Sequence, residues 1–349
     1  MPAQTAQPDE PIHTLHVYMD LIQVPVLALD SDLQRMKPLD ASKFRISLDS
    51  GPTFLPRTVR QQGDDPISLA ILLDPDGEAE IVPKLSEAIA ELAPGLLQPR
   101  DHVSVYTLDC RLIRTLHAAP ADPATLGPAV DRGLEPWLER HQAKRTEPCA
   151  TRSELWDSFS SVIRELAKLP GRRILLAVTN GDDRGSKNRW AEVRSYAQQS
   201  GVAVFGYVPA KLNPNDRANS PTSSIINPRV VRGSSSNPIL PGAAQAESPL
   251  SAICQLSGGM VMYVEQKNVA KQLAKFVTTV RERYILEFSR ARNDTPGEHG
   301  ILVSVTTNPR AYVRPAGVII LLPGRAEDAE TIPRDTTNAP QMGTHKPVR

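Results

Sequence analysis

The chain has 349 residues, with 40 lysines and arginines against 39 aspartates and glutamates, and a formal net charge of +1. This length allows one sizeable core and a smaller second one, and the near-zero charge argues against a nucleic acid as the main partner. No apolar run is long enough to span a bilayer, so no transmembrane segment is expected. Residues 1–11 are polar and show no signal-peptide pattern, although a processed precursor would look the same.

The amino-terminal part predicts a small β unit. Residues 12–30 are rich in β-forming residues that partly alternate, and residues 44–48 alternate again, so both ranges predict strands. Residues 39–44 have the composition of a capped single helical turn. We expect residues 1–11 to be a disordered tail and residues 12–62 to form a β segment with too few strands to bury a core alone.

From Ile67 the pattern changes to alternating strands and helices. Residues 67–73 are almost continuously apolar, which predicts a strand buried on both faces, as in a parallel sheet. Further strands are predicted at 103–108, 112–116, 173–178, 202–208 and 260–264. Helices are predicted at 81–92, 153–169, 190–200, 249–256 and 269–283, with a weak helix at 125–138 broken by Gly133 and Pro136. Residues 66–281 therefore predict an α/β domain with a doubly wound, mostly parallel sheet.

The last part of the chain predicts loop and strand segments. Residues 209–247 are a low-complexity stretch of Pro, Asn, Ser, Gly and Ala, expected to be a flexible loop, with a lid or binding loop as the alternative. Residues 282–324 contain strand patterns at 284–288, 301–305, 311–313 and 318–322. We expect them to pack with residues 12–62 as a small β-sandwich-like domain made from both chain ends. Residues 325–349 are expected to be a disordered tail.

Three cysteines are widely separated and form no Cys-x-x-Cys pair: Cys110, Cys149 and Cys254. A zinc knuckle is therefore not expected. One disulfide with one cysteine left over stays open beside three free thiols, and buried free thiols are the commoner case.

Acidic residues follow the first buried strand. Asp74, Asp76 and Glu78 fall at alternate positions, at the carboxyl end of a strand, where open α/β sheets place their ligand sites. Three carboxylates in such a loop can converge on one cation. The alternative is a turn followed by a helix, because Pro75 and Asp76-Gly77 are turn residues and acids favour a helix amino end.

Three strand-end loops carry polar residues in one order, namely Asp74-x-Asp76-x-Glu78, Ser153 and Asn180-Gly181-Asp182-Asp183. This order resembles the von Willebrand factor A-type domain, and more widely the related proteins of acidobacteria, over residues 12–324. The resemblance implies a metal-ion-dependent adhesion site for a divalent cation. It also implies a protein or cell-envelope partner and an extracytoplasmic location, secreted or periplasmic.

The chain departs from the family pattern, which has Asp-x-Ser-x-Ser, Thr and Asp on the three loops. Asp74 keeps its identity, whereas acids replace both serines, Ser153 replaces the threonine and Asn180 replaces the aspartate. Hard oxygen ligands of this kind suit Mg²⁺ or Ca²⁺, but longer acids would displace the cation and repel a partner carboxylate. The residues favour a degenerate site without metal, while a bound cation with ligands Asp74, Asp76, Glu78, Ser153 and Asn180 stays open.

Other chemistry is sparse. Seven histidines are scattered with no Cys or Ser nucleophile at a recognisable spacing, and no Gly-rich loop opens a helix. Asp182 and Asp183 are interpreted as a solvated turn or a helix cap. We expect a non-enzymatic binding or adhesion-type module that meets its partner at the loops on the carboxyl edge of the sheet. The alternative is a structural or scaffolding protein with a dead metal site.

Overall fold

The computed structural model describes residues 21–75, 81–93, 95–142, 154–209, 248–289, 295, 297–315 and 319–322. The predicted strand residues 12–20, the predicted loop residues 210–247 and both predicted tails lie outside the described residues.

A six-stranded sheet forms the centre of the molecule, in the order β6-β5-β4-β7-β8-β9. Five strands are parallel and β6 returns antiparallel beside β5. All seven residues of β4 are buried, as its continuous apolar sequence predicts. The strands are β4 (Ile67–Leu73), β5 (His102–Leu108), β6 (Leu112–Pro120), β7 (Arg172–Val178), β8 (Val202–Pro209) and β9 (Val261–Val264).

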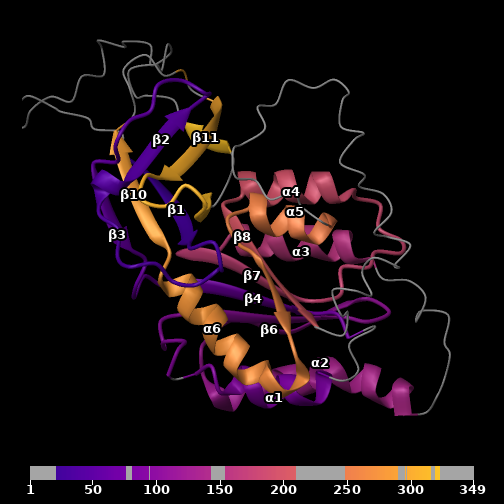
Figure 1. Ribbon diagram of the computed structural model, residues 1–349. Helices are drawn as coiled ribbons and strands as arrows, with labels where there is room; N and C mark the ends of the chain where they lie inside the picture. Colours follow the sequence, from indigo (N-terminus) through magenta and orange to yellow (C-terminus); the bar gives the residue numbers. More distant parts are fainter. Residues whose placement is uncertain are drawn as a thin grey trace, which may run out of the picture.

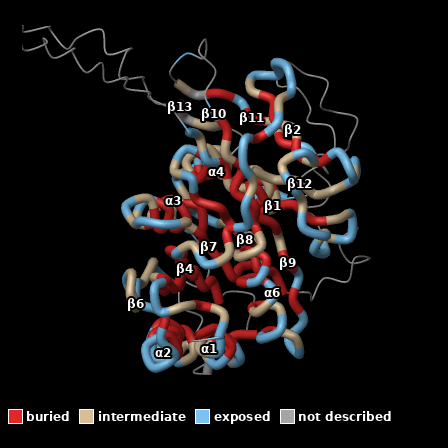
Figure 2. Tube along the Cα trace, turned by 90° about the vertical axis from the view of Figure 1, so that its left-hand side faces the viewer, coloured by how far each residue is buried: buried red, intermediate tan, exposed pale blue. Residues whose placement is uncertain are grey.

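Helices cover both faces of this sheet (Figure 1). One core is formed with α1 (Val82–Ala90), α2 (Pro123–Gln142) and α6 (Val269–Arg281). The other is formed with α3 (Leu155–Ala167), α4 (Trp190–Gln199) and α5 (Pro249–Leu256). Figure 2 shows the buried strands between helices whose outer sides are exposed. The predicted α/β class with a mostly parallel sheet is confirmed.

The predicted break at Gly133 and Pro136 is wrong, because α2 runs through both residues and also contains Pro128. Each proline removes a helical hydrogen bond, but the apolar face of α2 is buried against the sheet, and this packing outweighs the local propensity. Gly133 is required here: a Cβ at this position would lie 2.3 Å from Oγ1 of Thr107 in β5.

Two antiparallel sheets built from both ends of the chain form the sandwich. One has the order β12-β1-β10-β3 and the other β13-β11-β2. Their facing sides enclose a separate core in which the rings of Phe44 and Tyr284 meet edge to face at 5.3 Å. The strands are β1 (Leu21–Leu29), β2 (Phe44–Leu48), β3 (Thr58–Gln61), β10 (Tyr284–Ser289), β11 (Gly297–Val305), β12 (Tyr312–Pro315) and β13 (Ile319–Leu322).

The capped turn predicted at 39–44 is confirmed as the short 3₁₀ helix η1 (Ala41–Lys43). The carboxylate of Asp40 accepts a hydrogen bond from the backbone N–H of Ser42 at 2.8 Å. A hydrogen bond from the hydroxyl of Ser42 lowers the pKa of Asp40, and this backbone bond adds to the effect.

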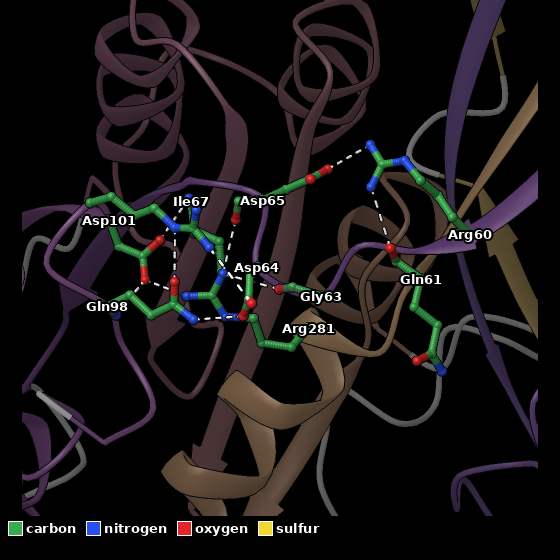
Figure 3. A network of polar contacts seen from close by, with 10 residues as sticks. Arg60, Gln61, Gly63, Asp64, Asp65, Ile67, Gln98, Asp101 and Arg281 are labelled. Atoms are coloured by element: carbon green, nitrogen blue, oxygen red, sulfur yellow. Dashed lines mark hydrogen bonds and ion pairs between the residues drawn. The ribbon is translucent and has the colours of Figure 1, made fainter.

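The sandwich contacts the central sheet at the amino ends of its strands. Arg172 at the start of β7 donates to Oε1 of Gln23 in β1 at 3.2 Å. The hydroxyl of Tyr312 donates to the carbonyl oxygen of Gly259, just before β9, at 2.8 Å. Figure 3 shows the contacts around Arg281, which donates to the carbonyl oxygen of Gly63 and to the buried carboxylate of Asp101. The carboxyl edge of the parallel strands is therefore turned away from the sandwich.

The cysteines differ in their bonding. Cys254 is a buried free thiol, whereas Cys110 is disulfide-bonded, so the favoured expectation of three free thiols is wrong and the alternative with one disulfide is supported. Cys149 lies outside the described residues.

In the described part of the chain, no helix combines the length and apolar character needed to cross a membrane.

Candidate functional site

The candidate site is the carboxyl edge of the central sheet. The parallel strands β4, β5, β7 and β8 all end at this edge. The residues that follow them there include Asp74 after β4, Asp109 after β5 and Thr179-Asn180 after β7. Polar groups are thus gathered where an open α/β sheet usually binds its ligand.

Asp74 lies in the interior of this edge, with 2% of its surface exposed. Its backbone N–H donates to the carbonyl oxygen of Val178 at 2.9 Å, and its Oδ2 accepts a hydrogen bond from the hydroxyl of Thr179 at 2.7 Å. The same hydroxyl accepts from the N–H of Gly181 at 3.0 Å. Asp74 therefore joins the end of β4 to the loop after β7.

Asn180 is exposed and turned into its own loop. Its Oδ1 accepts a hydrogen bond from the backbone N–H of Asp182 at 2.8 Å, which is an Asx turn. Gly181 between them has φ of +84°, a left-handed conformation that glycine adopts without strain. The amide oxygen of Asn180 thus stabilises the turn.

The loop after β7 also caps α3. The Oδ1 of Asp183 accepts hydrogen bonds from the N–H groups of Leu155 at 2.9 Å and Trp156 at 3.4 Å. The hydroxyl of Ser186 accepts from the N–H of Trp156 at 2.9 Å. The described cap residue, Glu154, makes no side-chain cap bond. A loop 28 residues away therefore satisfies the open amide groups at this helix end.

Asp157 in the first turn of α3 binds the loop in return. Its two carboxylate oxygens accept from the N–H groups of Lys187 at 3.0 Å and Asn188 at 2.9 Å. Burial pushes the pKa of Asp157 upward, but these N–H groups outweigh it and leave the pKa below its ordinary value. The carboxylate is thus charged at neutral pH and holds the loop from the opposite direction.

A cavity of about 300 Å³ opens beside these contacts, between the β5–β6 turn and α3. The adjacent Asp109 is buried and ion-paired with Arg140 at the end of α2. The cavity is lined by Leu108, Cys110, Arg111, Leu112, Glu154, Asp157, Ser158 and Ser161.

Two of the five predicted metal ligands are described, and they lie at neighbouring strand ends. Asp74 bonds to Thr179, the residue before Asn180. Asp76, Glu78 and Ser153 lie outside the described residues. Of the two described residues, Asp74 accepts a hydrogen bond from Thr179 through one oxygen, and the side-chain oxygen of the neutral Asn180 accepts from Asp182. Across the described ranges, no three His, Cys, Asp or Glu side chains are grouped as metal ligands.

The interpretation of Asp183 as a helix cap is supported, although the helix is α3 rather than one that follows in sequence. Thr179 and Ser186 were not singled out from the sequence. Their signal is weak, since a threonine at a strand end and a serine three residues after an aspartate are both common in turns.

No protein-family model matches the chain, and a search of the curated proteins finds no match. Solved structures with a similar fold include proximal thread matrix protein 1 from the mussel byssus, at 9% identity and a TM-score of 0.40, covering 63% of this chain and 49% of that chain. A second structure of that protein, with a zinc-occupied MIDAS motif, matches at 10% identity with the same TM-score and coverage. An aerotolerance-related membrane protein from Bacteroides fragilis matches at 13% identity and a TM-score of 0.38, covering 61% of this chain and 98% of that chain.

The chain spans about half the length of the mussel protein. The fold described above rests on the strand order of this chain itself. Likeness at these TM-scores concerns the fold and gives no information about the metal or the partner. Membership of the acidobacterial family is not shown by these comparisons.

Proposed function

We propose that the chain is a non-enzymatic binding module of the von Willebrand A type. It engages a protein or a cell-envelope component through the loops at the carboxyl edge of its central sheet. The observation that supports this most is the placement of the sandwich. The sandwich contacts the amino edge through Gln23 and Tyr312, so it leaves the opposite edge for a partner.

The carboxyl edge is suited to binding because its third loop is held in place before a partner arrives. Asp183 and Ser186 bond to the first turn of α3, and Asp157 of α3 bonds back to the loop. A surface that is already ordered loses less conformational entropy on association. Exposed charged side chains on the same loop, such as Arg184 and Asp182, are available for polar contacts.

In this proposal the adhesion site is degenerate and the partner is bound without a divalent cation. The Oδ2 of Asp74 accepts from Thr179 and the Oδ1 of Asn180 accepts from Asp182. These groups stabilise the protein's own loops. Added Mg²⁺ or Ca²⁺ is expected to leave the melting temperature unchanged, whereas a metal-dependent site predicts a rise that Asp74→Ala removes.

We place the protein outside the cytoplasm. The disulfide at Cys110 supports this location, because disulfides persist in oxidising compartments and are rare in the cytosol.

The proposed surface is tested by comparing two charge reversals in the full chain. Arg184→Glu changes the carboxyl edge and Arg310→Glu changes an exposed position of the sandwich. Both are surface changes with small expected effects on folding. Partners are captured from a cell-envelope fraction with each variant and with a chain lacking residues 210–246. The affinity of any captured partner is then measured by titration with purified protein.

The proposal expects that Arg184→Glu weakens the measured affinity while Arg310→Glu leaves it unchanged. If Arg310→Glu weakens binding and Arg184→Glu does not, the sandwich makes the contact. That outcome would overturn the proposal in favour of the scaffolding alternative.

A further inference from the structure

The junction between the sandwich and the central sheet contains a buried arginine whose side-chain bonding differs from that of the arginines around it. Arg283 lies between α6 and β10, and its carbonyl oxygen accepts a hydrogen bond from the N–H of Gln62, just after β3, at 2.6 Å. The charge of Arg172 at the start of β7 acts on its guanidinium. Arg283 therefore lies where the sandwich meets the amino edge of the central sheet.

Arg283 is 2% exposed and Gln62 is 1% exposed. Within the described part of the chain, Nε of Arg283 and both amide atoms of Gln62 have no hydrogen-bond partner. Leaving a buried polar atom unbonded costs about 1–3 kcal/mol, and more for a charged group. Arg283 and Gln62 come directly beside the opposed pair Tyr284 and Gln61 of β10 and β3, so the two side chains leave the same face of this strand pair. Two side chains in this state indicate a component that the chain itself does not supply.

The nearby arginines have carboxylate or carbonyl partners among the described residues, unlike Arg283. Arg281 donates to the carboxylate of Asp101 and to the carbonyl oxygen of Asp65 at 2.9 Å (Figure 3). Arg172 lies 3.6 Å from Oδ2 of Asp65. The same carboxylate oxygen is also 2.8 Å from Arg60, so one aspartate serves two arginines.

Electrostatics point to a negatively charged component. Burial, together with the positive charge of Arg172, lowers the pKa of Arg283 to about 9. The guanidinium nevertheless keeps its proton at neutral pH. Among the charges of the described residues, only a cation acts on it appreciably, and a buried charge is stable only when it is paired.

We propose that Arg283 and Gln62 bind a small inorganic anion of the chloride type at the junction between the sandwich and the central sheet. The guanidinium supplies the positive charge and N–H donors, and the amide of Gln62 supplies further donors. An anion fits the guanidinium better than a water molecule because it neutralises charge as well as accepting hydrogen bonds, whereas the Oε1 of Gln62 is an acceptor that the anion does not bond. A monoatomic anion fits better than an organic one because both side chains are almost fully buried. This site lies on the edge opposite the proposed partner surface and does not depend on it.

The proposal predicts that chloride stabilises the assembled protein. An anion that binds the folded state and not the unfolded chain raises the melting temperature, and the rise grows with the logarithm of the anion concentration once this exceeds the dissociation constant. The full chain is unfolded thermally at constant ionic strength while chloride replaces gluconate, a much larger organic anion. The wild type is expected to gain on the order of 5 °C when chloride reaches about a hundred times its dissociation constant.

Two variants identify the site. Arg283→Met removes the charge and Gln62→Leu removes the amide, and both are expected to abolish the chloride-dependent shift. Arg283→Met is also expected to melt no lower than the wild type in gluconate, because it replaces an unpaired buried charge with an apolar side chain. Arg310→Met serves as the control, since Arg310 is exposed on the sandwich, and it should keep the full shift.

Bromide provides a direct test that does not need a variant. Crystals of the full chain grown in bromide should show an anomalous peak within hydrogen-bond distance of Arg283 and Gln62. Equal melting temperatures in chloride and gluconate would mean that Arg283 and Gln62 bond to each other or to water, and would overturn the proposal. A bromide peak without a shift in solution means binding at crystal concentration only, and overturns it as well.

Discussion

Asp101 gives the sharpest test of how the amino edge of the central sheet is joined to α6. It is fully buried, with 0% of its surface exposed. Its Oδ1 accepts a hydrogen bond from the N–H of Ile67 at 2.9 Å, and its Oδ2 accepts from the N–H of Gln98 at 2.7 Å and from Arg281. The substitution Asp101→Asn keeps the shape and one acceptor oxygen, but turns an NH₂ group toward donors.

The expected loss follows from the contacts that this NH₂ group breaks. If the remaining oxygen stays on Ile67, the N–H of Gln98 and the guanidinium of Arg281 both lose a charged acceptor. Each hydrogen bond to a charged group contributes roughly 1.5–3 kcal/mol. Arg281 keeps its two carbonyl acceptors, on Gly63 and Asp65, so it is not left without partners. We therefore expect Asp101→Asn to lower the free energy of unfolding by about 3–5 kcal/mol.

Urea unfolding, followed by circular dichroism, measures this difference through the midpoint at unchanged m-value. The matched control is Asp64→Asn, because the side chain of Asp64 is 77% exposed and its ion pair with Arg100 is long, at 3.8 Å. It should change stability by less than about 1 kcal/mol. The reasoning is refuted if Asp101→Asn costs under about 1 kcal/mol, or if the control costs as much.

Three further predictions concern packing, capping and acid stability. Gly259→Ala would bring a Cβ to 2.0 Å from a backbone oxygen of β8, so calorimetry should show that the free energy of unfolding falls by about 1–3 kcal/mol or more. The control is Gly95→Ala, which has open space around it and should leave the stability unchanged. Asp183→Ala should cost about 1–2 kcal/mol in urea unfolding by uncapping α3, and an equal cost for Asp182→Ala would contradict the cap. The hydrogen bond from His299 holds the pKa of Asp49 below its usual value. The charged carboxylate therefore stabilises the folded state above about pH 4, and this stabilisation is lost as the pH falls further. Stability measured against pH should therefore fall less steeply below pH 4 in Asp49→Asn, and parallel curves would exclude this origin.

The central strands could be predicted from the sequence because each is a short apolar run, and such runs indicate strands that are buried on both faces. The range predicted for β4 matches Ile67–Leu73, since a strand covered on both faces needs apolar residues throughout. In contrast, β3 (Thr58–Gln61) was not predicted as a strand. Its residues are mostly exposed, and its pairing with β10 comes from a segment more than 200 residues away.

The candidate site was predictable in position and less so in detail. A strand end followed by an acid placed Asp74 at the carboxyl edge, and the structure has it there. The capping of α3 by Asp183 could not be read from the sequence, because it joins two elements 28 residues apart through tertiary structure. Likewise, the continuous α2 depends on the packing of its apolar face, which local propensity at Gly133 and Pro136 does not report.

The pairing of β1 with β10 has a consequence for how the protein is made. Gln23 and Glu287, which bond across these strands, are separated by 264 residues. At ~5–20 residues per second on the ribosome, β1 waits roughly 10–50 s for its neighbour to emerge. Throughout that interval the nascent strand exposes unpaired backbone groups and apolar side chains, which invite association with other chains. The earliest of the described strands is thus among the last to reach its final place, and a chaperone that shields it would raise the yield of folded protein.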